Sequence, residues 1–310
     1  MISTPVRVRS VSYEAEDVLS FVLTDPAGTP LPEWTPGAHV DVVLPDGLVR
    51  QYSLCGDPAD RAGYRIAVLR EEDSRGGSAY LHEQVRPGSK LEIRAPRNNF
   101  PLLEAARYVL IAGGIGITPL LPMVREVEGK GAEWRLHYGG RRRSRMAFAD
   151  ELTAYGDRVR WYPEQECGLI PLAEILADAG SGALVYCCGP EPLLAAVEGS
   201  CRPEILRTER FHPKEVAVSG PDRPITVVLQ RSGRSVEVPA TRSILDALER
   251  AGEDVPSSCR EGTCATCETP VLEGEIDHRD SILTAEEKQA GKTMMICVSR
   301  AHSDRLVLDA

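Results

Sequence analysis

The chain has 310 residues, 42% of them hydrophobic and 26% charged, which is ordinary for a globular protein of two or three domains. Its net charge of −10 argues against nucleic acid and anionic membrane surfaces as partners. We find no apolar run long enough to span a bilayer and no signal peptide. Nine cysteines, an odd number, do not suggest a disulfide framework. We therefore expect a protein of the reducing cytoplasm.

Residues 1–103 are predicted to form an antiparallel β-barrel. Runs at 18–24, 38–44, 49–54 and 64–70 mix alternation with β-branched residues, and Pro, Gly and Asp separate them. Several short strands at this spacing are typical of a barrel.

Residues 104–218 change to alternating strands and helices. This alternation predicts an α/β domain with a parallel sheet. The expected strands are 108–112, 134–138, 158–162 and 183–187, and the expected helices are 120–128, 147–155, 172–178 and 192–199.

A linker at 216–224 precedes a third, smaller α+β domain at 224–310. A hairpin is expected from strands at 225–230 and 235–238, followed by a helix capped by Ser243. We see no internal repeat.

Four cysteines of this last domain, Cys259, Cys264, Cys267 and Cys297, have the spacing C-x4-C-x2-C with a remote fourth member. This is the plant-type pattern for a [2Fe–2S] cluster, whose irons favour soft thiolate ligands. A zinc site is the alternative, but zinc sites usually pair two C-x2-C units. The spacing therefore favours a carrier of single electrons.

Glycines lie where the first strand of the α/β domain turns into its first helix. Gly113, Gly114 and Gly116 would let a pyrophosphate approach the backbone and the helix N-terminus. The spacing differs from G-x-G-x-x-G, and tight turns also use glycine, so this loop alone decides little. A second loop, Cys188-Gly189-Pro190, follows a later strand, and strand ends are where such sheets bind ligands.

The barrel segment offers a candidate flavin site. Arg50 could bind a phosphate, Tyr52 could stack on a flat ring, and the Ser53 hydroxyl could meet a ring nitrogen. Downstream, the run Arg75-Gly76-Gly77-Ser78 precedes a helix and resembles an anion site. The alternative is a charged edge strand followed by an ordinary glycine turn.

In their joint order these motifs resemble the family of phthalate dioxygenase reductase and vanillate demethylase reductase, over essentially the whole chain. The resemblance implies a flavin-binding barrel, a nicotinamide-binding α/β domain and a plant-type ferredoxin domain. The motifs are Arg50-Gln51-Tyr52-Ser53-Leu54, Arg75-Gly76-Gly77-Ser78, Pro96–Leu102, Gly113–Pro119, Cys188-Gly189-Pro190, Glu209-Arg210-Phe211 and the four cysteines.

The resemblance further implies FMN rather than FAD. By this analogy, the flavin phosphate binds Arg50, Ser78 and the amides of Gly76 and Gly77, and the flavin ring lies by Tyr52 and Ser53. The strand Ala67-Val68-Leu69 is expected to supply backbone contacts, and Phe211 to lie where nicotinamide enters.

On the nucleotide side, the resemblance places Gly114 and Gly116 at the pyrophosphate, with Thr118 and Cys188 beside the nicotinamide. Gly189 and Pro190 continue that loop. Ser53, Thr118, Cys188 and Phe211 are thus the residues expected around the hydride transfer.

Three features leave questions open. Ala265 stands where relatives commonly carry glycine, which could alter an N–H contact to sulfur. Leu69 stands where lysine is frequent. The arginines at 141–145 could bind the 2′-phosphate of NADPH or form a solvated basic loop; we expect NADH, with NADPH possible.

Electron counting connects these parts. NADH gives two electrons and a [2Fe–2S] cluster takes one, so a flavin is needed between them. We see neither a Rieske Cys/His pair nor a haem-binding cysteine motif, so the expected partner is a separate terminal oxygenase, of Rieske type or a cytochrome P450. The alternative function is a zinc-stabilised scaffold without redox activity.

Overall fold

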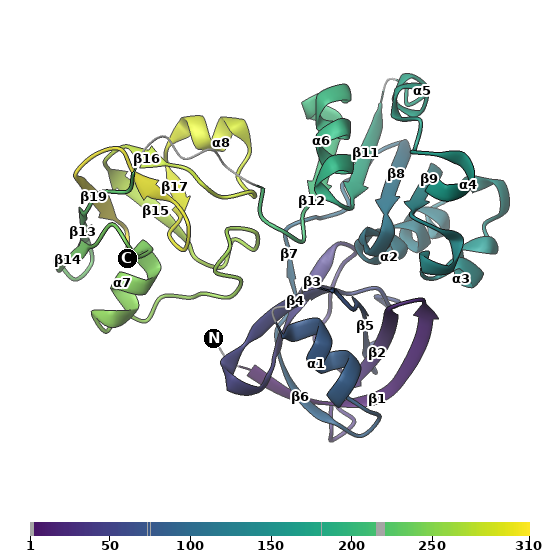
Figure 1. Cartoon of the computed structure of the whole chain (residues 1–310), viewed down its shortest axis with the longest axis horizontal. Helices are drawn as coiled ribbons and strands as arrows, with labels where there is room; N and C mark the ends of the chain where they lie inside the picture. Colours follow the sequence, from purple (N-terminus) through teal and green to yellow (C-terminus); the bar gives the residue numbers. More distant parts are fainter. Residues whose placement is uncertain (1–2, 73, 75, 181, 215–220) are drawn as a thin grey trace. The chain divides into compact units, whose positions relative to one another are not determined.

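The computed structural model describes residues 3–72, 74, 76–180, 182–214 and 221–310, with only the backbone of Asp46. The chain forms two compact units, Met1–Glu209 and Arg210–Ala310 (Figure 1). The finer boundaries near residues 103 and 218 stay predictions, and residues 216–220 of the predicted linker lie outside the described ranges. Within those ranges, no helix is long and apolar enough to cross a membrane.

The first unit begins with an antiparallel sheet in the order β4-β3-β6-β1-β2-β5, with β7 paired to β3. A bridge between Leu54, directly after β4, and Ile66 in β5 joins the outer strands, so the sheet closes into a barrel. The strands are β1 (Ser3–Ala15), β2 (Val18–Thr24), β3 (Ala38–Val43), β4 (Val49–Ser53), β5 (Tyr64–Leu69), β6 (Lys90–Arg94) and β7 (Arg97–Asn98).

Inward-facing side chains fill the barrel with an apolar core, in which Val6, Phe21 and Ile93 are buried. Helix α1 (Gly77–Gln84) lies across the mouth of the ring of strands and adds Leu81 to this core (Figure 1). The barrel therefore holds the N-terminus of α1 against its strands.

The rest of the first unit is built on a five-stranded parallel sheet in the order β10-β9-β8-β11-β12. Helix α2 packs on one face, and α5 and α6 pack on the other. The strand order reverses at β8, so the carboxyl ends of β8 and β11 flank the point where such sheets bind ligands. The elements are β8 (Arg107–Gly113), α2 (Ile117–Gly129), β9 (Glu133–Gly140), α3 (Ala149–Thr153), β10 (Val159–Pro163), α4 (Glu164–Cys167), α5 (Leu172–Ala177), β11 (Ala183–Cys188), α6 (Glu191–Ser200) and β12 (Leu206–Glu209).

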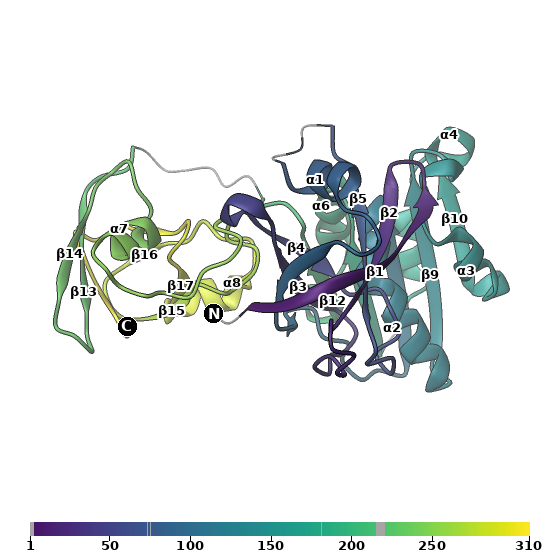
Figure 2. The ribbon, with the colours of Figure 1, turned by 90° about the horizontal axis from the view of Figure 1, so that it is seen from below.

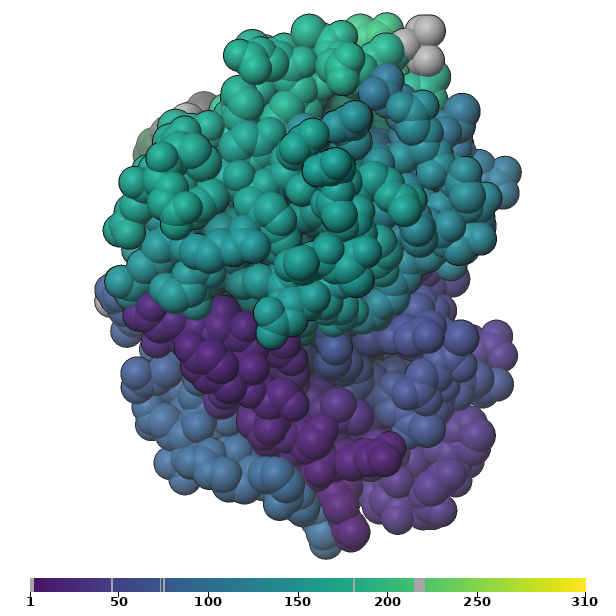
Figure 3. All heavy atoms as spheres, turned by 90° about the vertical axis from the view of Figure 1, so that its right-hand side faces the viewer, coloured from purple at the N-terminus to yellow at the C-terminus, as the bar shows by residue number. Residues whose placement is uncertain are grey.

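The barrel and the parallel sheet pack directly on each other within this unit (Figure 3). Arg125 of α2 donates to the carbonyl oxygen of Gly56 at 2.5 Å and also pairs with Glu151 of α3. Glu151 in turn accepts from Arg65 of β5 at 2.8 Å. A hydrophobic cluster runs from Ala67 of the barrel into α2. These contacts hold β5 and the segment after β4 against α2 and α3.

The second unit has a mixed sheet in the order β14-β13-β19-β15-β17. Strands β13 and β14 form a hairpin and lie side by side (Figures 1 and 2). The hydroxyl of Ser243 accepts from the Asp246 amide at 3.0 Å, which confirms the predicted helix cap. The elements are β13 (Ile225–Leu229), β14 (Ser235–Val238), α7 (Ile244–Arg250), β15 (Glu268–Glu273), β16 (Ile276–Asp277), α8 (Ala285–Ala290), β17 (Thr293–Met295), β18 (Arg300–Ala301) and β19 (Arg305–Leu308).

Candidate functional site

The predicted phosphate site lies where β4 meets the N-terminus of α1. A Cβ atom on Gly77 would lie 2.6 Å from Cγ of Arg50, so only glycine lets the arginine pack on this helix end. The helix dipole and its first N–H groups attract an anion, and the guanidinium adds a positive charge. The structure therefore brings together Arg50, Gly76, Gly77 and Ser78.

Hydroxyl groups already surround this helix end. Ser74 accepts from the amide of Ala79 at 3.3 Å and from the hydroxyl of Ser78 at 2.9 Å. An oxygen acceptor thus lies at the helix N-terminus, which is the environment that a phosphate oxygen needs. The residues present fit a phosphate group; Arg75 of the predicted motif lies outside the described residues.

The last residues of β4 run from this phosphate site toward the parallel sheet. Burial raises the pKa of the Tyr52 phenol, so its ring stays neutral. Ser53 is buried, and its hydroxyl bonds to the carboxyl group of Glu209 at the end of β12. Ser53 is therefore a direct link between the barrel and the nucleotide sheet.

Strand β5 lies next to β4 in the closed barrel. Ala67 and Val68 are buried, and Leu69 is partly buried. The carbonyl oxygen of Val68 lies 2.8 Å from Nε2 of His82 in α1. Ala67 and Leu69 contact the hydrophobic cluster that continues into α2, so this strand offers backbone and apolar surface rather than charge.

The nucleotide loops at the ends of β8 and β11 are in close contact. A Cβ on Gly116 would lie 2.2 Å from the carbonyl oxygen of Cys188, so glycine is required there for packing between the loops. Gly114 lies two residues earlier, and Gly189 and Pro190 continue the other loop to α6.

Thr118 lies in the first turn of α2 and is buried. Its Oγ1 donates to the carbonyl oxygen of Ile115 at 3.0 Å, so its hydroxyl hydrogen has a partner within its own turn. The hydroxyl oxygen retains the capacity to accept a hydrogen bond.

Glu209 is the residue that sequence reasoning left without a role. It pairs in register with Cys188 across β11 and β12 and bonds to Ser53. Its Oε2 is buried without a hydrogen-bond partner among the described residues. Burial raises the pKa of Glu209 to about 8, so the group is mostly a neutral acid at pH 7. Its place at a strand end beside Cys188 is the signal that could have identified it.

Burial also raises the pKa of the Cys188 thiol well above its usual range, and Glu209 acts in the same direction once it ionises. The thiol is therefore neutral. Ser53, Cys188 and the buried Oε2 of the partly exposed Glu209 together form an uncharged group of proton donors and acceptors where the barrel meets the nucleotide sheet.

The four predicted ligands Cys259, Cys264, Cys267 and Cys297 lie together in the second unit. The sulfur of Cys259 interacts with those of Cys264 and Cys297, and Cys267 interacts with Cys297. These contacts lower the pKa of the Cys259 and Cys267 thiols and raise those of Cys264 and Cys297. Among the described residues, no group of three or more His, Cys, Asp or Glu side chains is spaced to hold a metal ion. The chemistry of the donor set, four thiols with the plant-type spacing, nevertheless fits a thiolate-ligated [2Fe–2S] cluster.

Backbone geometry in the cysteine loop explains why Ala265 is unusual. Its φ is +56°, a left-handed conformation that favours glycine. Its carbonyl oxygen accepts from the amide of Glu268 at 3.0 Å, which closes the turn around the ligands. The amide of Glu261 donates to Sγ of Cys259 at 3.3 Å, an N–H to sulfur contact of the predicted kind. Ala265 therefore adopts a glycine conformation at the cost of strain.

Phe211 belongs to the second unit and is 36% exposed. Its predicted place near the flavin ring stays a prediction.

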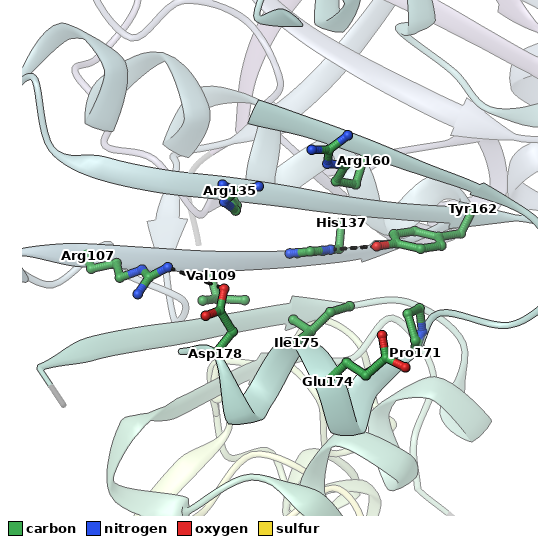
Figure 4. Close-up of a pocket in the computed structure, with 10 residues that line it drawn as sticks. All are labelled: Arg107, Val109, Arg135, His137, Arg160, Tyr162, Pro171, Glu174, Ile175 and Asp178. Carbon is green, nitrogen blue, oxygen red and sulfur yellow. Dashed lines mark hydrogen bonds and ion pairs between the residues drawn. The ribbon is translucent and has the colours of Figure 1, made fainter. Parts of the chain in front are cut away.

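A cavity of about 290 Å³ lies on the face of the parallel sheet beside α5 (Figure 4). Arg135 and Arg160 line it, together with His137, whose Nδ1 lies 3.1 Å from the Tyr162 hydroxyl. Burial lowers the pKa of His137 to about 4. None of the predicted site residues lines this cavity, which separates it from the site described above.

A ferredoxin-type unit in one chain with a flavin-type barrel and a nucleotide sheet defines a class of electron-transfer oxidoreductase, and comparisons with known proteins agree. The model of the 2Fe-2S iron-sulfur cluster binding domain matches residues 227–302. Phenoxybenzoate dioxygenase subunit beta of Ectopseudomonas oleovorans is 46% identical over 100% of this chain and 98% of its own length. The carnitine monooxygenase reductase subunit of Escherichia coli is 41% identical over 98% of this chain and 97% of its own length.

Solved structures extend the likeness to the whole fold. Phthalate dioxygenase reductase matches with a TM-score of 0.73 at 40% identity, over 99% of this chain and 98% of its own. An intact type IV self-sufficient cytochrome P450 monooxygenase matches with a TM-score of 0.91 at 44% identity. That match covers 100% of this chain but only 41% of the P450 protein.

The chain belongs to the phthalate dioxygenase reductase family. The predicted fold class is confirmed, as is the prediction of an oxygenase reductase with flavin, nicotinamide and [2Fe–2S] cofactors. The zinc-stabilised scaffold is not supported.

Proposed function

We propose that this chain, with FMN and a [2Fe–2S] cluster bound, is the NADH-dependent reductase of a separate terminal oxygenase, of Rieske type or a cytochrome P450. The hydrogen bond between Ser53 and Glu209, next to Cys188, is the observation on which the proposal rests. It joins the flavin-type strand of the barrel to the carboxyl ends of a nucleotide sheet. Phthalate dioxygenase reductase is described as a modular structure for electron transfer from pyridine nucleotides to [2Fe–2S].

Arg50, Ser78 and the first amides of α1 would hold the phosphate of FMN. One helix N-terminus offers one phosphate site, which matches a mononucleotide. Tyr52 and Ser53 would flank the ring, with the backbone of β5 beside it. When bound, FMN accepts a hydride and gives up electrons one at a time, the conversion that a one-electron cluster requires.

The loops after β8 and β11 would hold NADH, with Gly114 and Gly116 near its pyrophosphate. Thr118 and Cys188 would border the nicotinamide; Phe211 stays the residue that the family resemblance expects near the flavin ring. Because Cys188 and Glu209 are neutral, the site presents no fixed negative charge to a hydride in transit. Glu209 would keep its proton at pH 7 while its carboxyl group accepts from the Ser53 hydroxyl.

The four cysteines would hold the cluster from which electrons leave. Residues 222–310 carry 16 acidic and 11 basic side chains, a net charge of −5. We propose that this acidic surface steers the unit toward a basic patch on the oxygenase. The relatives named as parts of dioxygenase and monooxygenase systems support a partner of this class.

A visible spectrum and an anaerobic NADH titration test the proposal together. We expect flavin and [2Fe–2S] bands in the purified chain, FMN in the extract, and bleaching of both bands by NADH. Cys297→Ser should remove the cluster bands while flavin bleaching remains, which separates the two cofactors. A colourless protein that contains zinc would refute the proposal.

We also propose a cytoplasmic location. No disulfide joins any of the nine cysteines, all of which lie in the described part of the chain, and several of them, such as Cys55 and Cys187, are buried thiols. A reducing compartment maintains free thiols in this state. Fractionation of the source cells should recover the flavoprotein with cytoplasmic markers, and recovery with secreted proteins would contradict it.

A further inference from the structure

The arginine loop, residues 141–145, lies at a position that matters for the choice of nucleotide. It follows β9, the second strand of the parallel sheet, directly after the strand and helix that carry the glycine loop. In sheets of this type the adenosine ribose lies near the end of the second strand, where an arginine can accept the 2′-phosphate of NADPH. The sequence alone leaves four arginines available for that role.

In the folded chain the turn between β1 and β2 binds two of them. Arg142 pairs with Glu16, and Nη2 of Arg145 lies 2.6 Å from Oδ2 of Asp17. Ser144 joins the same contact: its Oγ donates to Glu16 at 3.1 Å, and its carbonyl oxygen accepts from the Glu16 amide at 2.9 Å. The barrel thus holds the arginine loop through both backbone and side chains.

A third arginine is also engaged, because the guanidinium of Arg143 lies 3.7 Å from the ring centroid of Trp161. Among the described residues, the side chain of Arg141 forms no hydrogen bond, ion pair or cation–π contact. Three of the four guanidinium groups therefore have other contacts.

The turn itself has an uncommon conformation. Asp17 has φ +63°, a left-handed value that costs free energy for a residue other than glycine. The amide of Arg70 donates to the carbonyl oxygen of Asp17 at 2.8 Å and fixes this geometry. The fold holds the strained residue where its carboxylate meets Arg145.

We propose that Glu16 and Asp17 determine the selectivity for NADH over NADPH. The inference rests on the proposed function, since it concerns the nucleotide of that reaction. A 2′-phosphate at the arginine loop would have to break two ion pairs and would approach two carboxylates. The 2′-hydroxyl of NADH carries no charge and meets neither cost.

The double variant Glu16→Gln, Asp17→Asn tests the proposal. Both changes keep the size of the side chain, and asparagine tolerates the left-handed conformation. We expect kcat/KM for NADPH to rise about tenfold relative to NADH, about the effect of one charge-assisted hydrogen bond. Calorimetry should also show 2′-AMP binding tighter relative to 5′-AMP, a readout that is independent of flavin and cluster.

Two further variants complete the design. Glu33→Gln removes an exposed ion pair with Arg61 on the barrel. It should leave unchanged both the kcat/KM ratio of NADPH to NADH and the affinity ratio of 2′-AMP to 5′-AMP. Adding Arg142→Gln and Arg145→Gln to the double variant should abolish the gain. If the double variant does not fold, the single variants Glu16→Gln and Asp17→Asn are measured in the same way.

An unchanged 2′-AMP to 5′-AMP ratio in a folded variant would overturn the proposal, as would a wild-type preference for NADPH. A lower stability without any change in selectivity would mean that the contact only fastens the barrel to the sheet. If the wild type oxidises neither nucleotide, the proposed function fails by itself, and the binding measurements still decide the role of Glu16 and Asp17.

Discussion

Glu209→Gln is the most direct test of the neutral site between the barrel and the nucleotide sheet. Burial raises the pKa of Glu209 from 4.5 to about 8. In the unfolded chain the carboxyl group ionises at its ordinary pKa, whereas in the folded chain it keeps its proton up to about pH 8. The folded chain is therefore most stable, as far as this group is concerned, when the pH lies below the pKa of the unfolded chain. That stability is lost as the pH rises through the pKa of the folded chain.

The size of this effect follows from about 1.4 kcal/mol per pH unit. Between pH 5 and pH 8 the group should lower the free energy of unfolding by about 4 kcal/mol. This is an upper bound, because Glu209 as a whole is partly exposed although its Oε2 is buried. Glutamine has no charge to bury and can still bond to Ser53, so the variant should avoid this loss.

The assay is urea unfolding of wild type and Glu209→Gln at pH 5, 6.5 and 8, with the same flavin content. The two proteins should be similar at pH 5, and the variant should be more stable by an amount that grows toward pH 8. The rate of anaerobic hydride transfer in the variant should stay within a few-fold of the wild-type rate at pH 7. The wild-type rate should decline near pH 8, where Glu209 ionises, and the variant should not show this decline. Glu104→Gln, an exposed site in the same unit, is the control. A stability difference that does not depend on pH would refute the reasoning.

Four other changes test the remaining parts of the site. Arg50→Gln should weaken FMN binding about tenfold or more, measured by flavin fluorescence, with the cluster bands unchanged. Ala265→Gly should stabilise the cysteine loop by about 1 kcal/mol and slow the loss of the cluster in chelator, because glycine is unstrained at φ +56°; faster loss would count against strain there. Cys188→Ala should slow hydride transfer to the flavin, and an unchanged rate would remove its positioning role. Reduction of the oxygenase should slow as salt is raised, and a rate independent of salt would exclude electrostatic steering.

The sequence predicted the bounds of helices and strands well where a single hydrophobic pattern continued over the whole element. The strand expected at 18–24 has those bounds, and those expected at 49–54 and 64–70 differ by one residue. Helix α2 begins at Ile117, three residues before its expected start, because Pro119 is tolerated in a first turn that needs no N–H donor. Helix α3 covers only 149–153 rather than 147–155, and Phe148 before it has φ +60°.

In the candidate site, too, the features formed by sequence neighbours could be predicted, and those formed by residues far apart in the sequence could not. The glycine loops could be predicted because a strand end, a glycine and a helix start are neighbours in sequence. The link between Ser53 and Glu209 could not, since the two residues come from strands of different sheets. The same holds for Glu16 and Arg142, which are 126 residues apart. Such pairs depend on how the barrel packs on the sheet, and periodicity carries no information about that packing.

The distribution of charge matches the chemistry of each part of the chain. Where a hydride would pass, burial keeps Cys188 and Glu209 neutral, and the buried groups exclude water. Where single electrons would leave, the second unit carries an excess of carboxylates that can guide a partner over several ångströms of solvent. The first step needs a preformed site without water rather than long-range attraction, whereas the absence of charge in the second place would slow the encounter. The fold separates the two requirements by burying the titratable groups of one step and exposing those of the other.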